Sequence, residues 1–229
     1  MYMVKENLLK VRERIAKSAK LSGRRPEEIK LIAVTKRCAL PVIEEAIECG
    51  VTDIGENRVQ DAEVKFEKLG GKTRRHMIGH LQTNKAKDAV RLFDMIHSVD
   101  SLRLAQAIDR ASAGEGKIQE ILLQVNVSGE ESKSGVTPEE AFVLLKDISA
   151  LKHIRLSGLM TMAPVVSEPE EARQVFRKLR ELKDGLNNKK FPGGVELKEL
   201  SMGMTQDFEV AIEEGATMVR IGTAIFGAI

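Results

Sequence analysis

The chain has 229 residues, of which 42% are hydrophobic and 31% are charged, and this composition is typical of a folded globular protein. Lys and Arg total 36 against 34 Asp and Glu, and the chain holds one Tyr, seven Phe and no Trp. Because nucleic acid binding uses a basic field and stacking aromatic rings, we expect no nucleic acid partner.

The sequence also argues against secretion and membrane insertion. Charged residues recur from Lys5 through Arg14, and no apolar stretch reaches the length of a membrane span. The two cysteines, Cys38 and Cys49, show no metal-ligand spacing and are too few for a disulfide framework. We therefore expect a cytoplasmic protein that binds neither a metal nor a membrane.

The first predicted element is an amphipathic helix, because Val4, Leu8, Val11 and Ile15 recur at helical spacing. From there, short apolar runs alternate with helical patterns. The predicted strands span residues 29–35, 51–55, 76–79, 95–99, 121–127, 156–160, 197–202 and 218–221. The predicted helices between them span residues 41–48, 58–69, 84–93, 102–113, 138–150, 170–187 and 206–214.

This alternation predicts an α/β fold, a TIM-type (β/α)8 barrel formed by residues 1–229 as a single domain. A doubly wound open sheet is the alternative, but no G-x-G-x-x-G motif follows the first predicted strand. Too few residues follow the last strand to form a full eighth helix. We therefore expect the N-terminal helix to fill that gap on the outside of the barrel.

Reactive groups of such barrels gather where the strands end, because eight loops surround one cavity there. Lys36 directly follows the first apolar run, so its stem would begin inside the barrel mouth. Loss of water around this side chain would favour the free amine that Schiff-base chemistry needs. The alternative is a lysine that extends outward into solvent, and position alone does not exclude it.

Phosphate groups in barrels recurrently bind the loops after strands seven and eight. Residues 201–203 (Ser201, Met202 and Gly203) and the pair Gly222 and Thr223 occupy these loops. Thr205 stands where it could cap the predicted helix 206–214, and Gly215 could end that helix.

Arg220 lies two residues before Gly222, so its side chain is expected to point into the barrel. A guanidinium there could hydrogen-bond the nitrogen of a pyridine ring or pair with a core carboxylate. An amine on the first strand would then face a phosphate site on the last two strands. Together these groups suit a phosphorylated aldehyde cofactor.

Six motifs carry a family resemblance that spans nearly the whole chain: AVTK at 33–36, GENRVQ at 55–60, HMIGHLQTNK at 76–85, SGLMTM at 157–162, LSMGM at 200–204 and VRIGTAIFG at 219–227. With these motifs the sequence resembles the pyridoxal phosphate homeostasis proteins, the YggS/PROSC family. That family is similar to the N-terminal barrel of alanine racemase, the fold-type III architecture of pyridoxal phosphate (PLP) proteins.

The resemblance implies that Lys36 binds PLP as a Schiff base and that Arg220 faces the pyridine nitrogen. It further implies that Asn57 borders the ring and that the phosphate is held by Ser201, Gly222 and Thr223, beside Gly203. The family usually has serine where Thr205 stands, and His80 matches a family position whose role is open. Lys133 could be a second amine near the mouth, or simply a solvated loop lysine.

An arginine at the pyridine nitrogen restrains carbanion chemistry, because it keeps that nitrogen largely unprotonated. Alanine racemases add a tyrosine base from a second domain, whereas the one tyrosine here is Tyr2. We expect a carrier or regulator of PLP supply that exchanges PLP with recipient PLP enzymes or free amino acids. The alternatives are a slow PLP-dependent amino acid racemase or lyase, and a cofactor-free Schiff-base aldolase.

Overall fold

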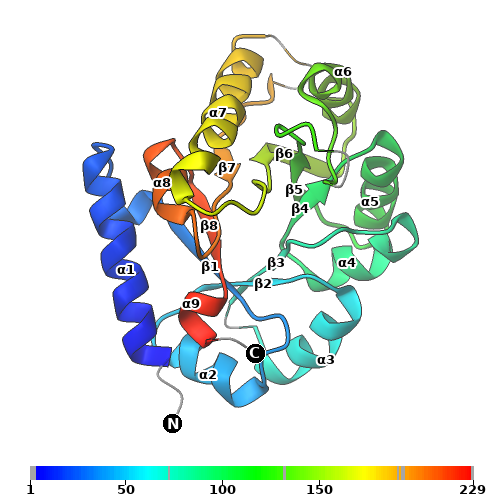
Figure 1. Ribbon diagram of the computed structural model, residues 1–229. Helices are drawn as coiled ribbons and strands as arrows, with labels where there is room; N and C mark the ends of the chain where they lie inside the picture. The colour runs from blue at the N-terminus through cyan, green and yellow to red at the C-terminus, as the bar shows by residue number, and fades with distance from the viewer. Residues whose placement is uncertain (1–3, 72, 131–132, 190, 192–193, 228–229) are drawn as a thin grey trace.

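Eight parallel strands form a closed barrel in the computed structural model, which describes residues 4–71, 73–130, 133–189, 191 and 194–227. Each strand pairs with the next, and β1 pairs with β8 to close the ring (Figure 1). The predicted barrel is confirmed. The strands are β1 (Lys30–Val34), β2 (Asp53–Glu56), β3 (Arg74–Met77), β4 (Met95–Val99), β5 (Gln119–Gln124), β6 (Ile154–Met160), β7 (Glu199–Ser201) and β8 (Met218–Ile221).

Helices surround the barrel, as the alternating sequence pattern predicts (Figure 1). They are α1 (Val4–Leu21), α2 (Leu40–Glu48), α3 (Val59–Leu69), α4 (Ala86–Leu92), α5 (Leu102–Gly114), α6 (Pro138–Ser149), α7 (Arg173–Asn187), α8 (Phe208–Glu213) and α9 (Thr223–Phe226). Short 3-10 turns span η1 (Pro26–Glu28), η2 (Thr83–Lys85) and η3 (Pro169–Ala172). No helix in this described part of the chain is both long and apolar enough for a membrane span.

The extra N-terminal helix occupies the predicted gap in the outer ring. Helix α1 contacts α8, α9 and α2, and Figure 1 shows it along the outside of the barrel beside α8. Its buried face includes the predicted residues Val4, Leu8, Val11 and Ile15. The amphipathic stripe therefore predicted both this helix and the side of it that packs on the barrel.

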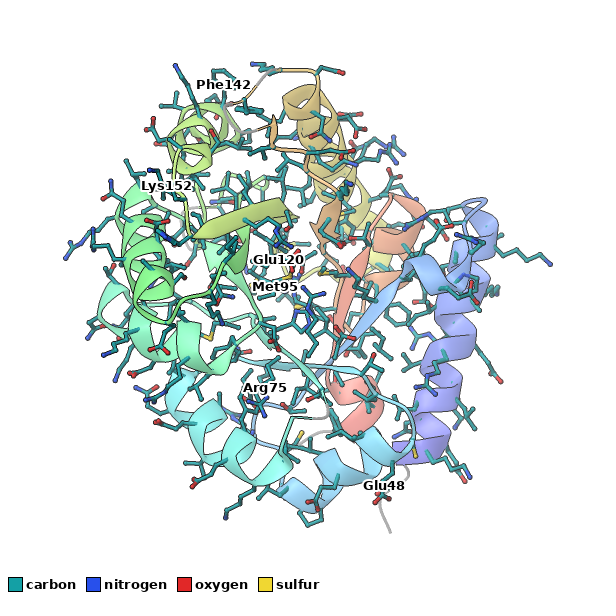
Figure 2. The ribbon with its side chains drawn as sticks, turned by 180° about the vertical axis from the view of Figure 1, so that it is seen from behind. Glu48, Arg75, Met95, Glu120, Phe142 and Lys152 are labelled. Carbon is teal, nitrogen blue, oxygen red and sulfur yellow. The ribbon has the colours of Figure 1, made fainter. Side chains whose placement is uncertain are left out.

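The apolar core has two parts. The larger one lies between the strands and the outer helices, and helix residues such as Phe66, Phe176 and Phe208 fill it. The smaller one is a separate cluster of five buried side chains: Ile32, Met95, Leu122, Met160 and Met218. Figure 2 shows Met95 near the centre of the molecule.

Polar side chains are also buried among the strands. His76 on β3, His97 on β4, Ser201 on β7 and Arg220 on β8 are all buried, and hydrogen bonds join them. Burying such groups is costly unless each has a partner. The strands therefore carry a buried layer of hydrogen-bonded polar side chains inside the barrel, and Arg220 belongs to it.

Several predicted boundaries differ from the observed ones. Helix α8 begins at Phe208, and Asp207, which accepts a hydrogen bond from the Met204 N–H at 2.6 Å, holds the turn before it. The expected cap at Thr205 is therefore wrong. Gly215 does end this helix, since it follows Glu214 with a φ of +99°. Tyr2 lies outside the described residues.

Gly158 allows β6 and β7 to approach, and this contact yields a stability prediction. A Cβ at Gly158 would lie 1.9 Å from the Glu199 carbonyl oxygen, which is backbone and cannot rotate away. We expect Gly158→Ala to lower the free energy of unfolding by about 2 kcal/mol or more, as overpacking does. Gly185, inside α7 with open space around it, is the control: Gly185→Ala should be neutral or stabilising by up to about 1 kcal/mol. Urea denaturation measures both, and equal stabilities would contradict the β6–β7 contact.

Candidate ligand site at the barrel mouth

A cavity of about 280 Å³ opens at the carboxyl ends of the strands. Five predicted site residues line it: Lys36, Asn57, Arg220, Gly222 and Thr223. Val34 at the end of β1 and Ile78 after β3 also line it. The remaining lining comes from the loops after β6 and β7: Met162, Pro164, Val165, Val166, Met204, Thr205, Gln206 and Asp207. The closed barrel thus brings together residues from β1, β2 and β8 that lie far apart in sequence.

Lys36 stands at the tip of a tight turn that follows β1. The Cys38 N–H donates to the Thr35 carbonyl at 3.0 Å, and Arg37 takes a φ of +61° at the turn position that usually favours glycine. The Lys36 side chain is exposed. The expected loss of water around this amine is therefore wrong, because β1 ends at Val34 and the turn carries Lys36 outward.

Buried contacts hold the base of this turn. Thr35 donates its hydroxyl to Glu56 Oε1 at 2.6 Å, and Lys65 Nζ donates both to that oxygen and to the Thr35 carbonyl. Glu56 is fully buried, so its ion pair with Lys65 joins β2, α3 and the end of β1 in a single cluster. The turn therefore presents Lys36 from a fixed base.

Asn57 is held by the close approach of two loops. A Cβ at Gly79 would lie 2.3 Å from the Asn57 carbonyl oxygen, so only glycine fits there. The segment after β3 therefore packs directly on the segment after β2, and Asn57 lies in the cavity wall. His80, one residue after Gly79, is instead exposed, with its Nδ1 3.6 Å from Asp100 Oδ2.

Arg220 forms the floor of the cavity and is only 4% exposed. Its guanidinium donates to Ser201 Oγ at 2.6 Å and to the Thr161 carbonyl at 2.9 Å. Burial lowers the pKa of Arg220 to about 10, although the negative charge of Asp207 acts to raise it. The guanidinium therefore stays charged at neutral pH. Of its five N–H donors, these two bonds leave others free to meet a ligand.

Asp207 is an acidic residue of the cavity wall whose charge acts on this arginine. Burial raises the pKa of its carboxyl, while the Met204 N–H and the charge of Arg220 act in the opposite direction. Its Oδ1 already accepts from Met204, so the carboxylate mainly shapes the loop after β7. Sequence reasoning missed this role, because Asp207 looked like an ordinary residue of a predicted helix.

Two predicted phosphate residues, Ser201 and Gly203, do not line the cavity. The Ser201 hydroxyl is fully buried between Arg220 and His97. Gly203 has a φ of +90°, and a Cβ there would lie 2.6 Å from the Ala211 Cβ, so it lets α8 pack closely. The phosphate role of these two residues stays a prediction.

The Gly222–Thr223 pair, by contrast, stands open at the cavity. Gly222 precedes α9, whose first N–H groups have no acceptor within the helix. Thr223 is exposed on that first turn, and Thr205 lines the cavity from the loop after β7. The side chains and N–H groups here are those that an anionic oxygen prefers.

Lys133 does not line this cavity, and its neighbours Glu131 and Ser132 lie outside the described residues. A larger cavity, of about 540 Å³, lies at the opposite end of the barrel. Its Glu120 and Glu199 are already paired with Arg74 and Lys30. Since barrel chemistry belongs to the carboxyl ends of strands, the smaller cavity is the candidate site.

The closed parallel barrel, with a lysine on the turn after β1 and an arginine on β8 at its mouth, is the class of fold of the alanine racemase N-terminal domain. The family model of that domain matches residues 6–229. The chain belongs to the pyridoxal phosphate homeostasis protein family. A curated relative of that name from Aquifex aeolicus is 44% identical over 97% of this chain and 96% of its own length.

Solved structures agree with this assignment. The structure of PipY from Synechococcus elongatus PCC7942, described as having PLP bound, is 37% identical and superposes with a TM-score of 0.82, covering 93% of this chain and all of PipY. Alanine racemase from Clostridium difficile 630 is 18% identical with a TM-score of 0.74, covering 99% of this chain and 56% of the racemase. That second likeness shows the fold alone.

The buried His97 predicts a pH dependence of stability. Burial, followed by nearby positive charges such as that of Arg220, lowers its pKa well below 6.5. Below about pH 6.5 the unfolded chain gains a proton that the folded chain does not bind, so stability declines as pH falls toward the folded pKa. We expect His97→Gln to remove about 1 kcal/mol of the decline between pH 7 and 5.5. Thermal unfolding across this range measures it, with His80→Gln, at an exposed position, as the control. An unchanged decline in His97→Gln would contradict the neutral buried imidazole.

Proposed function

We propose that this chain binds PLP at Lys36 and supplies it to other molecules in the cytoplasm. One observation carries the proposal: the exposed amine of Lys36 shares a cavity with the buried guanidinium of Arg220 and the open Gly222–Thr223 loop. The curated relatives carry the name pyridoxal phosphate homeostasis protein, and PipY is described with PLP bound.

The residues of the cavity fit this cofactor. Its volume of about 280 Å³ is close to the lower end of small-molecule sites, roughly 300–1,000 Å³. PLP has an aldehyde, a pyridine nitrogen and a phosphate, and the cavity offers an amine, a guanidinium and the start of α9 to meet them. Gly222 lies close beside Val34, since a Cβ at Gly222 would be in van der Waals contact with the Val34 Cβ at 3.4 Å.

When bound, PLP supplies an aldehyde that condenses with amines. Lys36 provides the Nζ nucleophile from the tip of its turn. Arg220 stays charged at neutral pH and can only donate, so it would keep a ring nitrogen that faced it unprotonated. Asn57 would border the ring, and Thr223, with Thr205 from the loop after β7, would hold the phosphate oxygens, since all three residues line the cavity.

The same cavity suits a carrier better than a racemase or lyase. Among its described lining residues the titratable side chains are Lys36, Arg220 and Asp207. Asp207 is 4% exposed and bonded to Met204, so it is poorly placed to take a substrate proton. The exposed Lys36 turn leaves the cofactor open to an incoming amine, either a free amino acid or a lysine of a recipient PLP enzyme.

We expect Lys36→Ala to abolish the visible absorbance that the purified protein develops with PLP, because the attaching amine is gone. Borohydride treatment of the wild type, followed by peptide mass mapping, should find the pyridoxyl label on Lys36. Lys133→Ala is the control and should keep the full absorbance. Label on another lysine, or a fully coloured Lys36→Ala protein, would overturn the assignment.

A second measurement separates carrier from enzyme. We expect the PLP-loaded protein to restore activity to the PLP-free form of a PLP-dependent aminotransferase. Alanine in deuterated water should meanwhile exchange its α-proton no faster than with free PLP. Exchange accelerated by a factor of about 10⁴, the scale of one positioned base, would instead favour the racemase alternative.

A further inference from the structure

A continuous line of hydrogen bonds crosses the barrel from Arg220 on β8 to Asp53 on β2. Arg220 donates to Ser201 Oγ at 2.6 Å, and Ser201 Oγ lies 2.9 Å from His97 Nδ1. His97 Nε2 lies 2.9 Å from His76 Nδ1, and His76 Nε2 lies 2.8 Å from Asp53 Oδ1. We call these five residues the barrel relay.

The interior of the relay is shielded from water. Ser201, His97 and His76 are fully buried, and every ring nitrogen of both histidines has its partner within the relay. Only Asp53, at the far end, is partly exposed, and it also accepts from the Thr52 hydroxyl. Because water does not reach these side chains, the position of the hydrogen in each bond of the relay depends on the hydrogen bonds on either side of it.

The two ends of the relay decide the direction of every bond in it. A guanidinium can only donate, and an ionised carboxylate can only accept. The hydrogen bonds from His76 and Thr52 outweigh burial and lower the pKa of Asp53, so its carboxylate is ionised. When each imidazole carries one hydrogen, one arrangement gives every atom a partner: Ser201 O–H donates to His97 Nδ1, His97 Nε2–H donates to His76 Nδ1, and His76 Nε2–H donates to Asp53.

The surrounding charges oppose any other arrangement. Burial disfavours a charged His97, and so do the positive charges of Arg220, Arg74 and Lys30. Glu120 pairs with Arg74 and Glu199 pairs with Lys30, while Asp53 faces the far nitrogen of His76. A proton on His97 Nδ1 would leave the Ser201 oxygen between two donors, and its own hydrogen would lose its acceptor.

We propose that His97 is a positioning residue for the ligand site: it takes the hydrogen of Ser201, and the lone pairs of that hydroxyl then hold the Arg220 guanidinium toward the cavity. His76 and Asp53 fix the tautomer that His97 needs for this task. The effect on the cofactor rests on the proposed function, whereas the proton arrangement is a property of the chain itself.

The first test needs no PLP. Nitrogen NMR of ¹⁵N-labelled protein reports the tautomer of each imidazole and the rotation of the arginine side chain. We expect His97 to be neutral with its hydrogen on Nε2 between pH 7 and 8, His76 to carry a hydrogen on Nε2, and the Arg220 Nη signals to be resolved. A hydrogen on His97 Nδ1, or a charged His97 at pH 7, would overturn the relay whether or not the protein binds PLP.

The second test compares variants with matched chemistry. His97→Gln keeps one acceptor and one donor, whereas His97→Phe keeps only the volume. We expect His97→Phe to average the Arg220 Nη signals and to weaken PLP binding about tenfold, the scale of one charge-assisted hydrogen bond. His97→Gln should keep the Arg220 Nη signals resolved and should keep the PLP affinity within about threefold of that of the wild type, well under the tenfold loss.

Folding is followed by circular dichroism, and Ser201→Ala, which removes only the hydroxyl, replaces His97→Phe if that variant does not fold. Equal PLP affinity and equally resolved Arg220 signals in the variant and the wild type would show that the histidines merely fill the core. If the wild type binds no PLP, the proposed function fails, while the NMR result still decides the relay.

Discussion

The pairing of β1 with β8 is the constraint on which the site depends. It closes the barrel and sets Ile32 opposite Arg220 and Ala33 opposite Ile221. The two strands then end side by side, so the turn that carries Lys36 lies next to the Gly222–Thr223 loop. An open sheet of the same strands would leave the Lys36 amine and the Gly222–Thr223 loop at opposite edges. Closure, rather than any local motif, makes them one site.

Closure also creates an interior that must be filled, and this chain fills part of it with polar groups. Met95 and its apolar neighbours occupy one region of the interior, while Arg220, Ser201, His97 and His76 occupy another. A buried guanidinium is costly to desolvate, and its bonds to Ser201 and Thr161 offset that cost. The protein thereby keeps a permanent positive charge at the floor of its cavity.

The exposure of Lys36 suits the cavity to exchange. A buried lysine would shield its bound cofactor, as an enzyme that excludes water requires. Here the rigid Thr35–Glu56–Lys65 cluster holds the turn, while the amine itself reaches solvent. A fixed base with an open amine is suited to take up a ligand and release it to another amine.

Much of this was readable from the sequence. The alternation of apolar runs and amphipathic segments predicted the barrel, because strand and helix periods differ and act locally. The stripe on the first helix predicted how it packs, and the strand-end positions of Lys36, Arg220 and Gly222 predicted one shared cavity. These features depend on spacing along the chain and on a general property of barrels.

The tertiary structure decided what depends on distant partners. Lys36 is exposed and not desolvated, because the turn after β1 carries it outward. The Ser201 hydroxyl bonds with Arg220 and does not line the cavity. Its second partner is His97, a residue of the buried strand β4 that no sequence motif indicated. The His97–Ser201 contact joins residues 104 positions apart. The sequence by itself determined which residues reach the barrel mouth, and only the closed barrel determined which of them touch, because those contacts come from strands that are distant in sequence.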